Sequence, residues 1–216
     1  WSNVAEMVKK VVVEEGVTSV GDYAFYYGYQ NLTSVELADS VTSIGTGSFY
    51  LCTGLESIEL PKALTSIGGM AFAGTGLHKV DLPESATSLG YSLFSSCGNL
   101  VSVSLPENIT EIPSGMFSGS EALASVQIPA GVTTIGSSAF SGCSGLTAVQ
   151  LPEGVKSLGN SCFGDCTSLK SVRIPESVTS LGSYVFSGCS SLSEVELSNG
   201  LEAIGQYMFE DCSSLE

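Results

Sequence analysis

The chain has 216 residues, of which 43% are hydrophobic and 13% are charged, and its 22 acidic against 7 basic residues give a formal net charge of −15. This composition is too apolar for a disordered chain, and no apolar run is long enough to cross a membrane as a helix. The negative charge disfavours nucleic acid and anionic lipid as partners, and it favours basic proteins or cations.

The chain begins with a partial copy of a repeated unit, in which Trp1 fits the position of a later Phe and residues 8–13 carry the apolar pattern that follows. From there on, every phenylalanine lies in one register. Phe117 and Phe140 are 23 residues apart (140 − 117 = 23), and the other intervals differ from this by at most one residue. The nine members are Phe25, Phe49, Phe72, Phe94, Phe117, Phe140, Phe163, Phe186 and Phe209. A fixed period of roughly 20 to 50 residues indicates a stack of repeats.

Each copy predicts the same elements in the same order. A strand is expected over L-x-x-V-x-L, as in residues 146–151, because its inward Val and Leu are two residues apart. A proline usually follows and ends the strand, since it cannot donate a ladder hydrogen bond. V-T-S-I-G, as in residues 41–45, then predicts a short second strand, and the Ala-Phe segment predicts a single helical turn. All variation in length falls between Phe and the next Leu, which marks a surface corner.

The repeat L-P-x-x-V-T-S-I-G-x-x-A-F-x-x-C-x-x-L resembles the BspA-like, or Treponema-type, leucine-rich repeats of bacterial surface proteins, and the resemblance covers residues 8–216. We therefore predict one leucine-rich repeat solenoid over residues 1–216, as a piece of a longer repeat protein. It should be a right-handed coil of about nine repeats of about 23 residues, with a parallel sheet on its concave side and short strands and 3-10 or helical turns on its convex side. The resemblance implies an adhesive array that is secreted or on the cell surface, and it implies no reaction.

Three repeated positions are predicted to be structural. The Phe position should form a buried stack of rings. Six of the seven cysteines lie three residues after a Phe, and other small residues take the place of Cys at Gly28, Thr75 and Ser120, so we favour buried free thiols over disulfides. Proline at position 113 stands where other copies have Gly. Proline fixes φ at a negative value, so if all coils share one shape, those glycines also have negative φ and are expected to serve close packing. The framework is expected to be unchanged at Pro113.

Function is expected at the outward positions of L-x-x-V-x-L. Glu36, Glu59 and Asp81 share one outward position in three successive strands, and Glu56 lies beside them. Paired strands are about 4.8 Å apart, so these carboxylates should form a ladder of like charges. Either the ladder is only solvated, or it binds a basic or calcium-bearing partner. Calcium alone is disfavoured, because a flat ladder cannot surround one ion with six to eight oxygens.

Five tyrosines gather in the first two corners of the array: Tyr23, Tyr26, Tyr27, Tyr29 and Tyr50. Tyrosine is enriched at binding surfaces, so a partner site is one hypothesis and a glycan site a weaker one. The alternative is that the rings cover the end of the array or pack on an upstream coil. The remaining outward positions of the sheet are mostly small and carry no aromatic ring, which suits a protein partner better than a sugar.

The sequence carries no nucleophile-elbow, P-loop or zinc-protease motif, and its single histidine, His78, is expected to be a solvated surface residue. We therefore predict a non-catalytic module without catalytic residues, metal or cofactor. It should be extracellular or on the cell surface and bind a protein, of host or bacterial origin, through its concave face. It should bind neither nucleic acid nor the membrane interior. The alternative is a rigid spacer that presents another domain.

Overall fold

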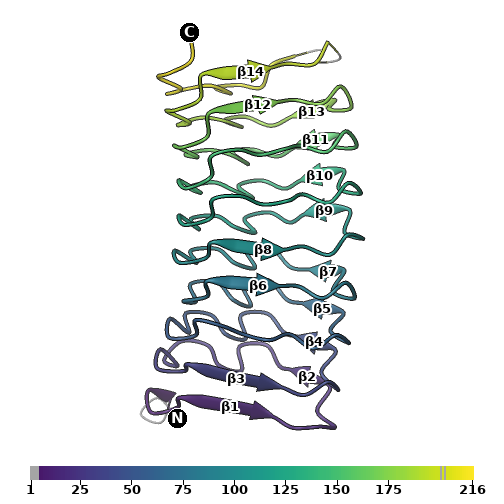
Figure 1. Ribbon diagram of the computed structural model, residues 1–216, viewed down its shortest axis with the longest axis vertical. Helices are drawn as coiled ribbons and strands as arrows, with labels where there is room; N and C mark the ends of the chain where they lie inside the picture. The colour runs from purple at the N-terminus through teal and green to yellow at the C-terminus, as the bar shows by residue number, and fades with distance from the viewer. Residues whose placement is uncertain (1–4, 200, 202) are drawn as a thin grey trace.

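The computed structural model describes residues 5–199, 201 and 203–216, and in it each repeat forms one turn of a β-solenoid. Figure 1 shows the turns stacked along one axis, with the two ends of the chain at opposite ends of the stack. The leucine-rich repeat solenoid predicted from the sequence is therefore confirmed. The position of Trp1 in a leading repeat lies outside the described residues.

The L-x-x-V-x-L segments form strands on one side of the stack, which we call the sheet face (Figure 1). These strands pair in parallel as β1–β3, β6–β8 and β12–β14. Their bounds are β1 Lys10–Val13, β3 Ser34–Leu37, β6 Lys79–Asp81, β8 Ser102–Ser104, β12 Ser171–Arg173 and β14 Glu194–Glu196. The inward Val of each strand is more buried than its outward neighbours, as the pleat requires.

The sheet face is interrupted where a continuous sheet was expected. Residues 57–60, 125–128 and 148–151 carry the same sequence pattern but form no ladder with their neighbours. Within the described chain, the backbone N–H groups of these three segments donate no hydrogen bond. The coils there are joined instead by ladders on the other sides of the solenoid.

Within the residues that the structure describes, the V-T-S-I-G segments form eight short strands that make a second parallel ladder, the back ladder, opposite the sheet face (Figure 1). It runs through β2, β4, β5 and β7, stops, and resumes through β9, β10, β11 and β13. The bounds are β2 Ser19–Val20, β4 Ser43–Ile44, β5 Ser66–Ile67, β7 Ser88–Leu89, β9 Glu111–Ile112, β10 Thr134–Ile135, β11 Ser157–Leu158 and β13 Ser180–Leu181.

Pro113 explains the break in the back ladder between β7 and β9. In other coils the Gly at this position donates its N–H to the preceding coil, as Gly136 does to the Ile112 carbonyl at 2.8 Å. Proline has no N–H to donate, so the matching bond to Leu89 cannot form. The expectation that Pro113 leaves the framework unchanged is therefore wrong.

The glycines of this position pack closely, as predicted. None of Gly45, Gly68 and Gly136 has a positive φ. A Cβ atom built on Gly159 would lie 2.4 Å from the backbone nitrogen of Ser137, a separation that real Cβ atoms essentially never show. The absence of a side chain lets successive coils approach one another here.

Replacing Gly159 with proline should repeat the break in the middle of the second half of the back ladder. It would remove the 2.8 Å bond from Gly159 N–H to the Ile135 carbonyl and force a ring against the preceding coil. We expect a loss of about 2 to 4 kcal/mol in the free energy of unfolding, measured by urea denaturation. Gly98→Ala is the matched control, since a Cβ at Gly98 meets nothing within 4 Å. Equal stability of the two variants would contradict this account.

The Phe-centred segments form the third side and are not helical, contrary to the expected helical turns. In the coil of Phe140, Ser138 and Gly142 both have positive φ, 56° and 73°, which interrupts any helix. The N–H groups of Ser138, Phe140 and Gly142 donate to carbonyls of the next coil at 2.8 Å. Positive φ two residues before and after Phe recurs in all nine copies, so this side is a ladder between coils.

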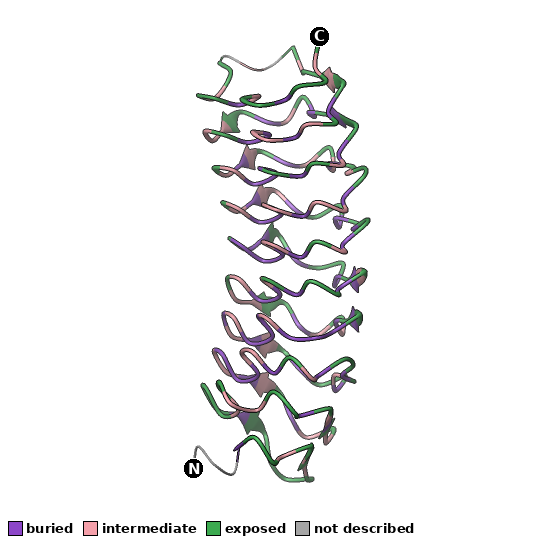
Figure 2. Cartoon of the chain, turned by 90° about the vertical axis from the view of Figure 1, so that its left-hand side faces the viewer, coloured by how far each residue is buried: buried purple, intermediate pink, exposed green. Residues whose placement is uncertain are grey.

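The core is a stack of phenylalanine rings beside a row of thiols. Consecutive Phe rings are stacked with centroids 5.2 to 5.9 Å apart, and those from Phe49 to Phe186 have no exposed surface. Figure 2 shows buried residues along the height of the solenoid. The buried Phe stack predicted from the sequence is confirmed.

The seven cysteines are buried free thiols. Cys143 donates its S–H to the carbonyl of Phe117, in the preceding coil, at 3.1 Å. Ser120 makes the same contact with the carbonyl of Phe94 at 2.8 Å. Ser can therefore replace Cys at this position, because both side chains are small and donate the same hydrogen bond to the preceding coil.

Candidate functional site

The candidate acidic residues all lie on the sheet face, but they do not form a regular ladder. Glu36 on β3 pairs with Lys10 on β1 at 2.5 Å, and Asp81 pairs with Lys79 on its own strand at 2.9 Å. Glu59 lies between them in a segment that forms no strand. The chain's own lysines therefore offset two of the three carboxylates, a feature that the spacing of the acidic residues alone did not indicate.

Glu56 and Glu59 are exposed, and neither has an ion-pair partner among residues 5–199, 201 and 203–216. Glu36 and Glu59 line one hollow of about 430 Å³, which lies between β3 and residues 57–59. The carboxylate of Glu59 is thus available to a partner at the edge of a recess. Such a site attracts positive charge, and salt should weaken that attraction.

The tyrosine cluster lies on the Phe-centred side. Tyr23, Tyr26 and Tyr27 are exposed, and the ring of Tyr26 stacks on Tyr50 with centroids 5.1 Å apart. Tyr29 is instead packed edge-on against Phe25 at 5.4 Å and belongs to the core. Because Tyr26 and Tyr50 cover one face of each other, less ring surface is left for stacking on a sugar.

A second exposed aromatic pair lies near the other end of the array. The rings of Tyr184 and Tyr207 stack with centroids 4.9 Å apart, and both residues have positive φ. They share their place in the repeat with Tyr23, two residues before Phe. Sequence reasoning missed this pair because it looked for local clusters, whereas residues one period apart become neighbours.

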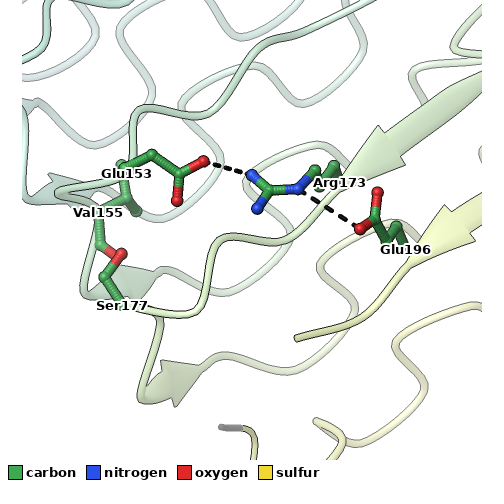
Figure 3. Close-up of polar contacts among 5 residues, drawn as sticks. All are labelled: Glu153, Val155, Arg173, Ser177 and Glu196. Atoms are coloured by element: carbon green, nitrogen blue, oxygen red, sulfur yellow. Dashed lines mark hydrogen bonds and ion pairs between the residues drawn. The ribbon is translucent and has the colours of Figure 1, made fainter. Parts of the chain in front are cut away.

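Arg173 on β12 joins two carboxylates across neighbouring coils (Figure 3). It hydrogen-bonds to Glu153, and its Nε lies 3.5 Å from Glu196 on β14. The hydrogen bond that Arg173 donates to Glu153, followed by the charges of Glu153 and Glu196, raises the pKa of Arg173 above its usual value. On the C-terminal part of the sheet face, one cation therefore links carboxylates of the coils on either side of it.

The side chains suited to chemistry are placed for packing or solvation. His78 is exposed, with its Nδ1 3.5 Å from the Glu56 carbonyl. Burial raises the pKa of the Cys52 thiol to about 12, so it stays protonated and a poor nucleophile near neutral pH. In the described parts of the chain, no three His, Cys, Asp or Glu side chains are grouped to hold a metal ion. A helix long and apolar enough to cross a membrane is also lacking there.

These features define the class of the protein: a leucine-rich repeat solenoid whose exposed faces offer charge and hydrogen bonds. The sequence signature of the BspA type leucine rich repeat region matches residues 18–147 and 116–216. The chain belongs to this family, whose repeats are generally non-catalytic.

Among the similar solved structures are two from bacteria. A leucine-rich repeat protein of Bacteroides ovatus is 28% identical, with a TM-score of 0.80, and the match covers 96% of this chain and 65% of that one. A leucine rich cell surface protein of Faecalibacterium prausnitzii is also 28% identical, with a TM-score of 0.57, over 96% of this chain and 74% of that one. The chain thus spans about two thirds of the length of the first of these proteins. No curated protein matches its sequence.

Proposed function

We propose that this array is a non-catalytic protein-binding module of a bacterial surface or secreted protein, and that its partner docks on the sheet face. The observation that carries this proposal is that the carboxylates of Glu56 and Glu59 are exposed and have no ion-pair partner among the described residues. Glu59 also lines a hollow of the sheet face together with Glu36. The similarity to a cell surface protein of Faecalibacterium prausnitzii supports an extracellular location.

The expected partner is a protein with a basic patch, of host or bacterial origin. The net charge of −15 would steer such a partner toward the array from a distance, and the sheet face would orient it. Lys10 forms an ion pair with Glu36, and Lys79 forms one with Asp81. We therefore expect a basic partner to contact Glu56 and Glu59 first. Because these charges are exposed, they should affect the association rate more than the dissociation rate.

A rigid spacer is the second candidate, and the Phe stack favours it. The rings stack in one unbroken row from Phe25 to Phe209, and the ladder on the Phe-centred side joins each coil to the next, so the array should resist bending. A spacer would hold another domain away from the cell and would require no pattern on its outer surface. The tyrosine cluster as a glycan site remains a weaker hypothesis.

A pull-down from host epithelial and serum proteins tests the first candidate. The native array is compared with a Glu36→Lys, Glu59→Lys, Asp81→Lys variant. The matched control is Glu111→Lys, Glu121→Lys, Glu176→Lys, which makes the same change of charge at exposed positions away from the sheet-face strands. We expect a partner that the native array and the control retain and the sheet-face variant loses. Equal retention by all three would contradict binding through the acidic residues.

A further inference from the structure

A larger hollow of about 740 Å³ lies near the middle of the sheet face, between the unpaired segments 125–128 and 148–151. The outward side chains of Ser125, Gln127, Ala148 and Gln150 are exposed and line it, and Val149 lies partly exposed on its apolar side. A smaller hollow of about 240 Å³ lies between β8 and residues 125–128. Gln127 and Glu107 line both hollows. The two hollows form a recess that crosses several coils.

The side chains of this recess are the groups that a ligand on the sheet face would meet. The N–H groups of residues 125–128 and 148–151 have no hydrogen-bond acceptor in the described chain, but the two coils stay stacked, since the Thr147 N–H donates to the Ala124 carbonyl at 3.4 Å. The outward amides of Gln127 and Gln150 can hydrogen-bond to the main chain of an extended peptide, because they offer both a donor and an acceptor.

The charge pattern around the recess is equally specific. In a chain of net charge −15, the outward sheet positions of residues 101–104, 124–127 and 147–150 carry no charge at all. Glu107 is the only charged residue that lines the larger hollow, and it lies on the edge formed by the turn after β8. The centres of protein interfaces are depleted of charge and their rims are polar, and this arrangement follows that pattern.

We propose that the recess seats an extended polypeptide segment of the partner, with small or amide-bearing uncharged residues at its centre and a lysine or arginine beside them. This proposal rests on the sheet face being the protein-binding surface. The amides of Gln127 and Gln150 hydrogen-bond to the peptide main chain. Glu107, which lines both hollows, receives the basic flank.

The chemistry of the lining favours a peptide over other ligands. A phosphate or a carboxylate would meet Glu107 with no cation in the larger hollow to offset it. A sugar ring would meet no aromatic side chain there, since the lining consists of Ser, Gln, Ala, Val, Ile, Pro and Glu. A peptide satisfies the amide side chains of the lining and the charge on the rim together.

A displayed library of random twelve-residue peptides, panned against the full 216-residue chain, tests this proposal. The peptides that enrich are synthesised with a fluorophore, and their affinity is measured by polarisation. The test variant is Ala148→Arg, which places a large cation in the recess. Thr147→Arg is the matched control, because the adjacent Thr147 is exposed but does not line the hollow. Equal melting midpoints establish that both variants fold.

We expect enriched peptides with an uncharged centre and a basic flank, a loss of affinity of at least tenfold in Ala148→Arg, and less than a twofold change in Thr147→Arg. Peptides that bind Ala148→Arg normally but lose affinity on Glu59→Lys would overturn the recess while leaving the sheet face as the binding surface. Enrichment of no peptide, or of peptides insensitive to both changes, would overturn the recess as a peptide site. The pull-down with the Glu36→Lys, Glu59→Lys, Asp81→Lys variant then tests separately whether the sheet face binds a protein.

Discussion

Replacing Phe140 with alanine is expected to lower the free energy of unfolding by about 3 to 5 kcal/mol. The ring of Phe140 has no exposed surface and is stacked between Phe117 and Phe163, with centroids 5.3 and 5.2 Å away. Removing it opens a cavity in the middle of the stack, and the rigid coils on either side cannot collapse to fill it. The change is measured by urea denaturation followed by circular dichroism.

Phe209→Ala provides the matched control. Phe209 is the last ring of the stack, is only partly buried and has one stacked neighbour, Phe186, at 5.9 Å. Its loss should cost clearly less, because the transfer of its surface from water is incomplete. Equal costs at the two positions would mean that the stack does not carry the stability of the array.

Raising the pH above about 8.5 is expected to destabilise the protein steeply, because its thiols are buried. Burial raises the pKa of Cys52, Cys143 and Cys189 to about 12 in the folded state, against roughly 8.5 in an unfolded chain. The unfolded chain therefore loses these protons first. Their stabilising contribution is complete below pH of about 8.5 and is lost progressively as the pH rises from there toward about 12.

Comparing how the free energy of unfolding changes with pH in the native protein and in a serine variant separates the thiols from other groups that ionise in alkali. Between pH 8 and 9.5 the unfolded thiols are only partly ionised, so each contributes about 0.8 kcal/mol per pH unit and the three together roughly 2.5. A Cys52→Ser, Cys143→Ser, Cys189→Ser variant should show a slope smaller by about that amount, in urea titrations at pH 8 and 9.5 with a reductant present. Ser120 demonstrates that serine can make the same hydrogen bond. Identical slopes for the two proteins would contradict the buried-thiol account.

The periodicity of the sequence predicted the framework because every coil must match the next. The positions of Phe, Cys and Gly in the repeat indicate which residues contact the next coil. The structure confirms that the Phe rings stack, the Cys thiols are buried and the glycines pack closely. The non-helical backbone beside Phe could not be predicted in the same way. Residues as different as Tyr23, Ser138 and Gly142 adopt positive φ there, so no residue type in the sequence indicates this backbone conformation.

The candidate site was harder to predict, because outward residues are not constrained by stacking. The sequence placed Glu36, Glu59 and Asp81 on one face, but it did not indicate that lysines hold two of them. It also gave no sign that the strands of residues 125–128 and 148–151 are unpaired, since both segments carry the ordinary repeat pattern. Pro113 was the one visible cue to a break, and its missing N–H would have indicated the split in the back ladder.

Site-specific photo-crosslinking tests most directly whether the sheet face contacts a partner. Benzoylphenylalanine is introduced at Gln127, which is exposed on the sheet face, or at Ser137, which is exposed just after the back ladder. Each protein is irradiated with epithelial surface proteins. We predict a discrete covalent adduct from position 127 and none from position 137. An adduct from position 137 alone, or from both positions equally, would contradict binding through the sheet face.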